Sequence, residues 1–275
     1  MTKTALIILD GWGHGKKTAS NGIFNAKTPN IDKLYESSLN TELRTDGEYV
    51  GLPKGQMGNS EVGHLNLGAG RIVHQDLARI NNDIENNSFT NNKKLLDAIE
   101  KAKKKNKPIH IMGLLSDGGI HSHSSHLKAM CNIILYNGVN HIYIHAFTDG
   151  RDCDPKSGKN HIKDFLEYAK NKNISIASLV GRYYAMDRDK RWERTASAYR
   201  MLIHGQGHKT NSVINSIEKS YSNKITDEFI QPTIVVDEKK DPIAQLKNDD
   251  IAICFNFRSD RCRQIVAALT QVDIP

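Results

Sequence analysis

Ser60 has the sequence neighbours that most clearly suggest chemistry. It lies in a run of small and flexible residues, GQMGNSEVGH, that ends at His64. If a helix begins here, its free amide groups lie beside the Ser60 hydroxyl and can bind an anion. A base or a metal ion that lowers the pKa of this hydroxyl would make it a nucleophile. The same residue types also suit a plain helix N-cap at Ser60, with Glu61 in the first turn, so both interpretations stay open.

Asp10 is a candidate metal ligand. It follows the apolar run at residues 5–9 and precedes Gly-Trp-Gly. A carboxylate presented at the end of a strand is a common ligand of hard metal ions, although an Asp here can also simply form a turn. A divalent metal bound by Asp10 and Ser60 would activate the Ser60 hydroxyl. Two ligands do not hold a metal, so further Asp or His residues would be needed.

The arginines gather beside Gly, Asp and aromatic residues after three apolar runs, at residues 149–152, 181–188 and 258–261. Arginine binds phosphate and carboxylate groups through two parallel hydrogen bonds. Arg258 and Arg261 are three positions apart and would share a face if this segment is helical. The pattern predicts a pocket for a ligand that carries at least two anionic groups.

Three histidines follow a glycine-rich loop in the segment HSHSSH, at His121, His123 and His126. This spacing is found in metal-binding tracts, but it also suits the start of a helix. No second His or carboxylate cluster matches it, so the sequence favours anion contact by one of the three histidines over a metal site.

Apolar runs alternate with amphipathic segments along most of the chain, which predicts an α/β fold with a largely parallel sheet. Ligands bind at the carboxyl ends of the strands in such sheets, and every expected strand end here carries Asp, Arg or His. Strands are expected at residues 5–9, 109–115, 142–147, 174–180 and 251–257. Helices are expected at residues 28–38, 76–86, 93–105, 124–136, 158–171, 192–204, 212–221 and 259–269. A glycine-rich, strand-poor stretch at residues 46–71 suggests a domain boundary near Gln75.

The composition excludes several classes of protein. The 275 residues are 38% hydrophobic and 25% charged, which is typical of a globular protein and excludes disorder, collagen and coiled coil. The sequence predicts a cytoplasmic protein with no membrane partner, because no apolar run approaches the ~20 residues that cross a bilayer and no secretory signal is present. The net charge of +7 could indicate nucleic acid, but aromatic stacking platforms beside a basic groove are missing. The cysteines lack CxxC spacing and are expected to be reduced.

Six motifs occur in order across nearly the whole chain: DGWG at residues 10–13, GQMGNSEVGHLNLGAGR at 55–71, SDGGIHSH at 116–123, DGRD at 149–152, GRYYAMDRDKRWER at 181–194 and NFRSDRCRQ at 256–264. Together they resemble the cofactor-independent (2,3-bisphosphoglycerate-independent) phosphoglycerate mutase family. The resemblance implies an alkaline-phosphatase-like metal domain, whose N-terminal part is residues 1–74. It also implies an inserted α/β phosphotransferase domain at residues 75–275.

The resemblance further implies interconversion of 3-phosphoglycerate and 2-phosphoglycerate through a phosphoserine intermediate, with two manganese ions and no need for 2,3-bisphosphoglycerate. By motif position, Asp10 and Ser60 are metal ligands and Ser60 is also the nucleophile. Asp152 would handle the proton of the glycerate hydroxyl. The implied substrate-binding residues are His121, Arg151, Asp152, Arg182, Arg188, Arg258 and Arg261.

In one respect the sequence departs from the family pattern. The family's remaining metal ligands and a substrate-contacting lysine follow the inserted domain, and they would lie beyond residue 275. We therefore expect a truncated chain that alone binds manganese weakly and turns over little or no phosphoglycerate. A monomeric state is also expected. The alternatives are a metal-dependent phosphatase-type hydrolase, which would release free phosphate, and a non-catalytic fragment that binds phosphorylated acids.

Overall fold

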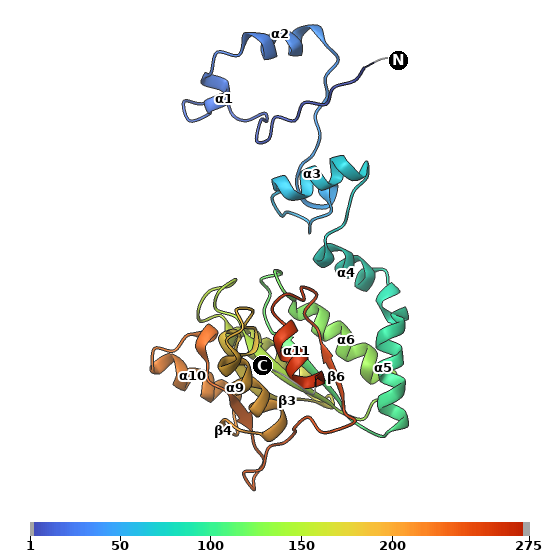
Figure 1. Ribbon diagram of the computed structural model, residues 1–275, viewed down its shortest axis with the longest axis vertical. Coiled ribbons are helices and arrows are strands. Elements are labelled where there is room, and N and C mark those ends of the chain that lie inside the picture. Colours follow the sequence, from blue (N-terminus) through green and yellow to red (C-terminus); the bar gives the residue numbers. More distant parts are fainter. Residues whose placement is uncertain (1–2, 272–275) are drawn as a thin grey trace. The chain divides into compact units, whose positions relative to one another are not determined.

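The computed structural model describes residues 3–271 and divides into two compact units, Met1–Ala78 and Arg79–Pro275 (Figure 1). The predicted phosphatase-like and phosphotransferase character of the two domains stays a prediction. Unit 1 contains α1 (Gly22–Asn25), α2 (Pro29–Ser37), the 3-10 helix η1 (Gly47–Val50) and α3 (Ser60–Ala69), and α4 (Asp76–Glu85) follows and continues into unit 2.

Unit 2 contains all the strands in the described part of the chain. Its elements are η2 (Ser88–Asn91), α5 (Lys93–Lys104), β1 (Ile109–Leu114), α6 (Ser124–Tyr136), β2 (Ile142–Thr148), α7 (Gly158–Ala169), β3 (Ile174–Gly181), α8 (Arg182–Ala185), α9 (Trp192–His204), β4 (His208–Thr210), α10 (Val213–Ser222), η3 (Asp227–Phe229), β5 (Thr233–Val235), β6 (Ile251–Cys254) and α11 (Arg263–Thr270).

The predicted first strand, residues 5–9, is wrong. No strand is formed there, and the side chains of Leu6 and Ile7 are 76% and 79% exposed. An apolar run of this length is typical of a buried strand, but a strand also needs a neighbour that accepts its backbone hydrogen bonds. Within residues 3–271, no segment pairs with this run.

Unit 1 has a small apolar core made by Val50, Leu52 and Val62. Val62 belongs to α3, whose N-cap is Asn59: the Asn59 Oδ1 atom accepts a hydrogen bond from the Val62 amide at 3.1 Å. Ser60 is therefore the first helical residue and not the cap. Its hydroxyl is not used to begin the helix and remains available for other contacts.

The prediction of an α/β fold with a largely parallel sheet is confirmed. Within the described residues, unit 2 holds a six-stranded sheet in the order β4-β5-β3-β2-β1-β6. Strands β3, β2, β1 and β6 are neighbours and run parallel, whereas β5 pairs antiparallel with β3. The carboxyl ends of these four strands consequently lie at one edge of the sheet.

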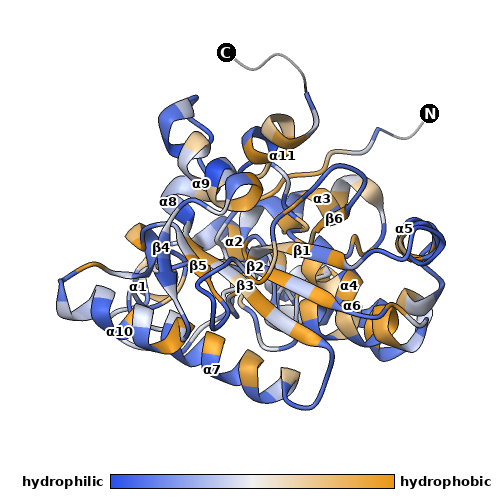
Figure 2. Ribbon diagram, turned by 90° about the horizontal axis from the view of Figure 1, so that it is seen from below, coloured by the Kyte–Doolittle hydropathy of each residue, from blue (hydrophilic) through white to orange (hydrophobic). Residues whose placement is uncertain are grey.

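Two apolar cores cover the two faces of this sheet. Side chains of β1 alternate between them: Ile111 packs in the core that includes α5, α6, α7 and α10, and Met112 in the core that includes α8, α9 and α11. Figure 2 shows mostly apolar residues on the central strands and polar residues on much of α5. Every helix in the described chain is too short or too polar to cross a lipid bilayer.

The end of the sheet differs from the prediction. Strand β6 stops at Cys254 rather than residue 257, and α11 begins at Arg263 rather than residue 259. The segment between them is an irregular loop, so Arg258 and Arg261 do not share a helical face. Strands β4 and β5, of three residues each, were not predicted.

Candidate active site

The residues of unit 2 that form the candidate site follow the carboxyl ends of four adjacent parallel strands. Ser116 and His121 follow β1, Asp149–Asp152 follow β2, Arg182 follows β3 and Arg258–Arg261 follow β6. Gly113 in β1 permits the close approach of the β6 loop. Its φ is +153°, and a Cβ atom there would lie 2.5 Å from the Asn256 Oδ1 atom, which accepts a hydrogen bond from the Leu114 amide.

Arg182 is the buried centre of the cluster. Its side chain is 2% exposed, and its Nη1 atom donates to Asp149 Oδ1 at 2.7 Å and to Asp152 Oδ2 at 2.5 Å. Burial alone would lower the pKa of Arg182, but the hydrogen bonds to Asp152 and Asp149 outweigh it and raise the pKa. Arg182 thus positions the Asp152 carboxylate, while Asp149 holds Arg182.

Asp149 was not predicted as a site residue, although it begins the DGRD motif. Burial would raise its pKa, but hydrogen bonds from the backbone at Asp152, from Arg182 and from Ser116 lower it. The buried Asp227 ties down the end of the loop that carries these residues, where α7 begins. The Asp227 carboxylate accepts from the Gly158 amide at 2.7 Å and from the Tyr221 hydroxyl at 2.5 Å.

His121 lies buried against Arg182 and is uncharged at neutral pH. Burial, and next the charge of Arg182, lower its pKa to about 4. Its Nε2 atom lies 3.1 Å from Arg182 Nη2, which can only donate, so Nε2 accepts and the proton of the neutral ring lies on Nδ1. Nδ1 is buried without a hydrogen bond, and so is the Asp260 Oδ1 atom 3.8 Å away, although the charge of Asp260 Oδ1 is paired with Arg258. Buried polar atoms without partners in a cluster of charges are typical of a site that a polar ligand completes.

Three further arginines surround this centre with partly exposed side chains. Arg188 donates to Asp260 Oδ2 at 2.9 Å, and the Nε atom of Arg258 lies 3.2 Å from Asp260 Oδ1. The Nη1 atom of Arg151 lies 3.5 Å from Glu228 Oε1. These exposed ion pairs are weak in water, so an incoming anion can replace the carboxylates at little cost.

Among the described residues, Arg261 is the arginine of this cluster that forms no ion pair with a carboxylate. Its Nη1 atom donates to the Met186 carbonyl oxygen at 3.4 Å, and among residues 3–271 no carboxylate lies within ion-pair distance of it. Burial lowers the pKa of its guanidinium, and three nearby guanidinium groups lower it further, those of Arg182, Arg188 and Arg151. A positive charge in such surroundings favours binding of an anion.

Unit 1 brings Asp10 and Ser60 together. The Ser60 Oγ atom donates to Asp10 Oδ2 at 2.7 Å, although fifty residues separate the two in sequence. His64, one turn later on α3, has its Nδ1 atom 3.2 Å from Ser60 Oγ and 2.8 Å from the Ser60 carbonyl oxygen. Sequence reasoning assigned no role to His64, although its i+4 spacing from Ser60 on a helix could have indicated this contact.

The Asp10–Ser60 pair fits part of a metal site. Both side chains offer oxygen atoms, which manganese and other hard ions prefer, and both are exposed. They supply two donors. The His64 Nδ1 atom, 3.2 Å from Ser60 Oγ, is the nearest further side-chain donor that the structure brings to the pair.

The structure brings together most of the residues that the sequence singled out. Ser60 contacts Asp10 in unit 1, and the predicted substrate residues of unit 2 form one cluster. Of the three histidines in HSHSSH, only His121 belongs to this cluster. His123 is the N-cap of α6, and the Nε2 atom of His126 lies 2.7 Å from Asn81 Oδ1.

Comparison with known proteins identifies the family. Residues 80–275 match the family model described as BPG-independent PGAM N-terminus. The chain is 52% identical over 271 residues to the 2,3-bisphosphoglycerate-independent phosphoglycerate mutase of Flavobacterium psychrophilum, covering 98% of this chain and 54% of that protein. The mutase of the same name from Methanococcoides burtonii is 49% identical over 265 residues, covering 96% of this chain and 51% of that protein.

A solved structure gives the same result. The phosphoglycerate mutase of Leishmania mexicana, studied at low cobalt concentration, superposes with a TM-score of 0.75 at 29% identity, covering 98% of this chain and 51% of that one. The chain spans about half the length of the relatives it matches. With this motif order, sheet and arginine cluster, the chain belongs to the family of 2,3-bisphosphoglycerate-independent phosphoglycerate mutases.

Proposed function

We propose that this chain acts in the interconversion of 3-phosphoglycerate and 2-phosphoglycerate, with the arginine cluster of unit 2 holding the phosphorylated acid. The single observation that carries the proposal is that Arg261, which forms no ion pair among the described residues, lies near the guanidinium groups of Arg182, Arg188 and Arg151. Phosphoglycerate carries a phosphate and a carboxylate, and each suits a pair of arginine hydrogen bonds.

Arg182 and His121 would position the glycerate. Because His121 is neutral, its Nδ1 atom can donate one hydrogen bond to a hydroxyl or carboxylate oxygen without adding charge. Asp152, which accepts a hydrogen bond from Arg182 at 2.5 Å, would accept a proton from a glycerate hydroxyl. The roles of Arg151, Arg188 and Arg258 would be to neutralise the two anionic groups.

Ser60 would receive the phosphoryl group. The Asp10 carboxylate accepts the hydrogen bond that the Ser60 hydroxyl donates and thereby orients the Ser60 Oγ atom. The first turn of α3 supplies amide groups for the phosphate. Asp10 and Ser60 would also hold a divalent ion, which when bound stabilises the serine oxygen as an anion. Return of the phosphoryl group to the other glycerate hydroxyl completes the isomerisation, so positioning and charge neutralisation supply most of the catalysis.

Manganese as the metal, two ions per site, a monomeric state and a cytoplasmic location are part of this proposal. They rest on the resemblance of the motifs. The cobalt named for the Leishmania mexicana protein supports a divalent transition metal.

Phosphorus NMR of the chain with 3-phosphoglycerate and manganese distinguishes the proposed activity from its alternatives. Appearance of 2-phosphoglycerate supports the mutase. Release of free phosphate alone would show a phosphatase-type hydrolase instead. Binding without either product is the outcome expected of a chain that spans about half the length of its relatives, and it would show capture of the phosphorylated acid without catalysis by this chain alone.

A further inference from the structure

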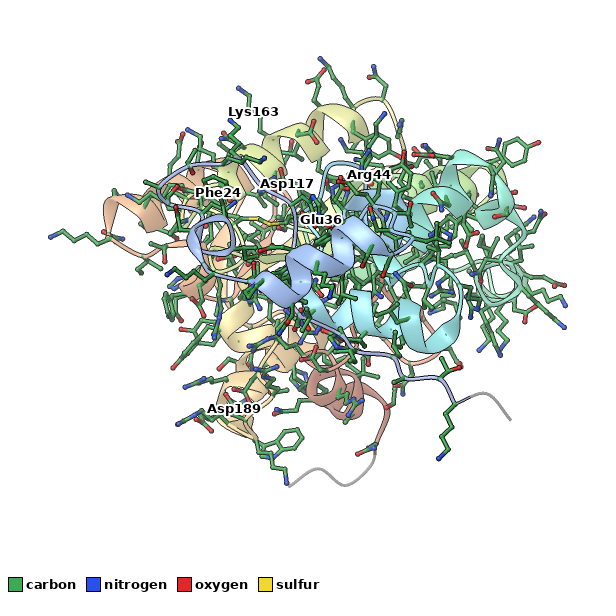
Figure 3. The ribbon with its side chains drawn as sticks, turned by 90° about the horizontal axis from the view of Figure 1, so that it is seen from above. Phe24, Glu36, Arg44, Asp117, Lys163 and Asp189 are labelled. Atoms are coloured by element: carbon green, nitrogen blue, oxygen red, sulfur yellow. The ribbon has the colours of Figure 1, made fainter. Side chains whose placement is uncertain are left out.

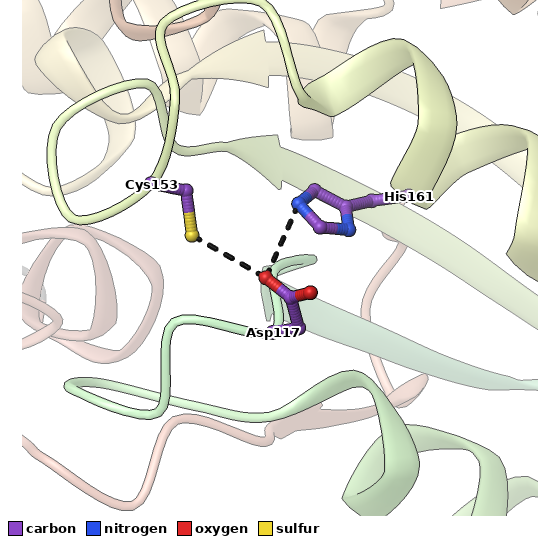
Figure 4. Close-up of side chains that lie close together, drawn as sticks. All are labelled: Asp117, Cys153 and His161. Atoms are coloured by element: carbon purple, nitrogen blue, oxygen red, sulfur yellow. Dashed lines mark hydrogen bonds and ion pairs between the residues drawn. The ribbon is translucent and has the colours of Figure 1, made fainter.

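A second group of potential metal ligands lies outside the arginine cluster and outside the Asp10–Ser60 pair. Asp117 comes from the loop after β1, Cys153 from the loop after β2 and His161 from α7 (Figure 4). The Cys153 Sγ atom and the His161 Nε2 atom each lie 3.5 Å from Asp117 Oδ1. The three ligand atoms all lie within 4.8 Å of one another and line an open pocket of about 670 Å³.

The two separations from Asp117 Oδ1 agree with the edges of a tetrahedral zinc shell. Zinc binds sulfur at about 2.3 Å, imidazole nitrogen at about 2.0–2.1 Å and carboxylate oxygen at about 2.0–2.2 Å. At the tetrahedral angle, such bond lengths place neighbouring ligand atoms about 3.4–3.6 Å apart. The separations of 3.5 Å from Asp117 Oδ1 to Cys153 Sγ and to His161 Nε2 fall within this range. The third edge, between the sulfur and the nitrogen, lies within 4.8 Å and is the one that metal binding would shorten.

His161 shows most directly that the group lacks a ligand. Its side chain is only 14% exposed, and its Nε2 atom is buried without a hydrogen-bond partner. Lys163, two residues later on the same helix, points outward from α7 (Figure 3). A buried imidazole nitrogen aimed at a carboxylate and a thiol is the donor set of a zinc-type ion and not of a hard ion such as manganese.

Cys153 is a free thiol in this structure, as are the other three cysteines. Burial is the main cause that raises its pKa, so the thiol is protonated at neutral pH when no metal is bound. A zinc-type ion would replace this proton: the S–H bond breaks, a sulfur–metal bond forms, and the proton goes to solvent.

We propose that Asp117 Oδ1, Cys153 Sγ and His161 Nε2 form a three-ligand site for a zinc-type divalent ion, with the fourth position open to the pocket. None of the three ligands has a role in the proposed mutase activity, so metal binding can be tested without it. Cys153 directly follows Asp152, and its Sγ atom lies 3.0 Å from the hydroxyl of Ser116, which also contacts Asp149. Metal binding would therefore fix the loop that carries Asp152, and the ion acts as a regulator of that loop.

Cobalt titration of the full chain tests this site without any activity measurement, because a thiolate bound to cobalt gives a charge-transfer band in the near ultraviolet. We expect one equivalent of cobalt to produce the band and zinc to abolish it by displacement. The variant Cys153→Ser should lose the band. His161→Gln should weaken cobalt binding at least about tenfold. Loss of a residue that only hydrogen-bonds a metal ligand already lowers metal affinity by about this factor, and loss of a ligand lowers it further.

Matched controls separate this site from others on the chain. Ser60→Ala should keep the band, because a hard-ion site at Asp10 holds no sulfur, and Cys254→Ser and His208→Gln should keep it as well. Alkylation provides a second readout: zinc should protect Cys153 from iodoacetamide in the unmutated chain and fail to do so in His161→Gln. Absence of the band, its persistence in Cys153→Ser, or unchanged affinity in His161→Gln would each overturn the proposal.

Discussion

Replacement of Arg182 by methionine tests how the buried centre of the arginine cluster is held together. Methionine has a similar length and no charge, so the variant keeps much of the packing and removes the guanidinium. Asp149, whose side chain is 2% exposed, then loses its hydrogen bond of 2.7 Å, and Asp152 loses its bond of 2.5 Å.

The expected cost follows from the burial of Asp149. Removing one partner of a buried ion pair typically destabilises a protein by about 3–5 kcal/mol, because the other charge stays buried and unpaired. The Ser116 hydroxyl and the amides of Arg151 and Asp152 still donate to Asp149. We therefore expect a loss near the lower end, about 3 kcal/mol at pH 7.

Arg188→Met is the matched control. Its guanidinium also donates to an aspartate, Asp260, at 2.9 Å, but the side chain is 46% exposed. Exposed pairs contribute about 0–1 kcal/mol, so this variant should lose much less stability.

Urea unfolding followed by tryptophan fluorescence measures the free energy of unfolding of unit 2 in the unmutated chain and in the two variants. The chain has two tryptophans, so a Trp12→Phe background leaves Trp192, at the start of α9, as the reporter.

The dependence of the stability on pH gives a second test. Because the folded pKa of Asp149 is lowered, its contribution is present above the unfolded value of about 4 and is lost as the pH falls through the folded value. The difference in the free energy of unfolding between the unmutated chain and Arg182→Met should therefore become smaller in acid. A loss of stability in Arg182→Met no larger than that in Arg188→Met would refute the reasoning.

Three shorter predictions concern other parts of the chain. Ser60→Ala should retain 3-phosphoglycerate binding in calorimetry yet form no phosphorylated enzyme in mass spectrometry; a phosphoryl adduct in this variant would exclude Ser60 as acceptor. The pKa of His121 is about 4 in the folded chain and about 6.5 in the unfolded chain, so the free energy of unfolding should fall by up to about 1.4 kcal/mol per pH unit as the pH drops between these values. His121→Asn should therefore show a smaller change of the free energy of unfolding from pH 7 to pH 5. Asn59→Ala should destabilise unit 1 by about 1 kcal/mol through loss of the α3 cap, visible as reduced helical circular dichroism on heating, whereas Asn30→Ala should not.

Much of unit 2 could be predicted from its sequence because local pattern and final packing agree there. The apolar runs that became β1, β2 and β3 are buried on both sides, as parallel strands are, and each is followed by a polar loop and an amphipathic helix. Since parallel strands in one sheet present their carboxyl ends at one edge, the convergence of the arginine-bearing loops followed from the same reasoning.

The errors arose where distant contacts decide the structure. Residues 5–9 have the composition of a buried strand, but pairing depends on another segment and cannot be seen in a local pattern. Strands β4 and β5 are too short for a periodic signal. Ser60 and Asn59 both suit an N-cap, and only the structure shows that Asn59 fills this position. Asp149 and Asp260 escaped notice because their importance lies in which arginines they contact.

Calorimetric titration of 3-phosphoglycerate tests the central claim, that the arginine cluster is a site for a phosphorylated acid. The titration compares the unmutated chain with Arg261→Ala, with and without manganese, and uses inorganic phosphate as the control ligand. We predict that 3-phosphoglycerate binds more tightly than phosphate, independently of manganese. We also predict that it binds about 10–100-fold more weakly in Arg261→Ala, the loss expected for one charge-assisted hydrogen bond of about 1.5–3 kcal/mol. Equal binding of phosphate and 3-phosphoglycerate, or an unchanged affinity in Arg261→Ala, would contradict the account.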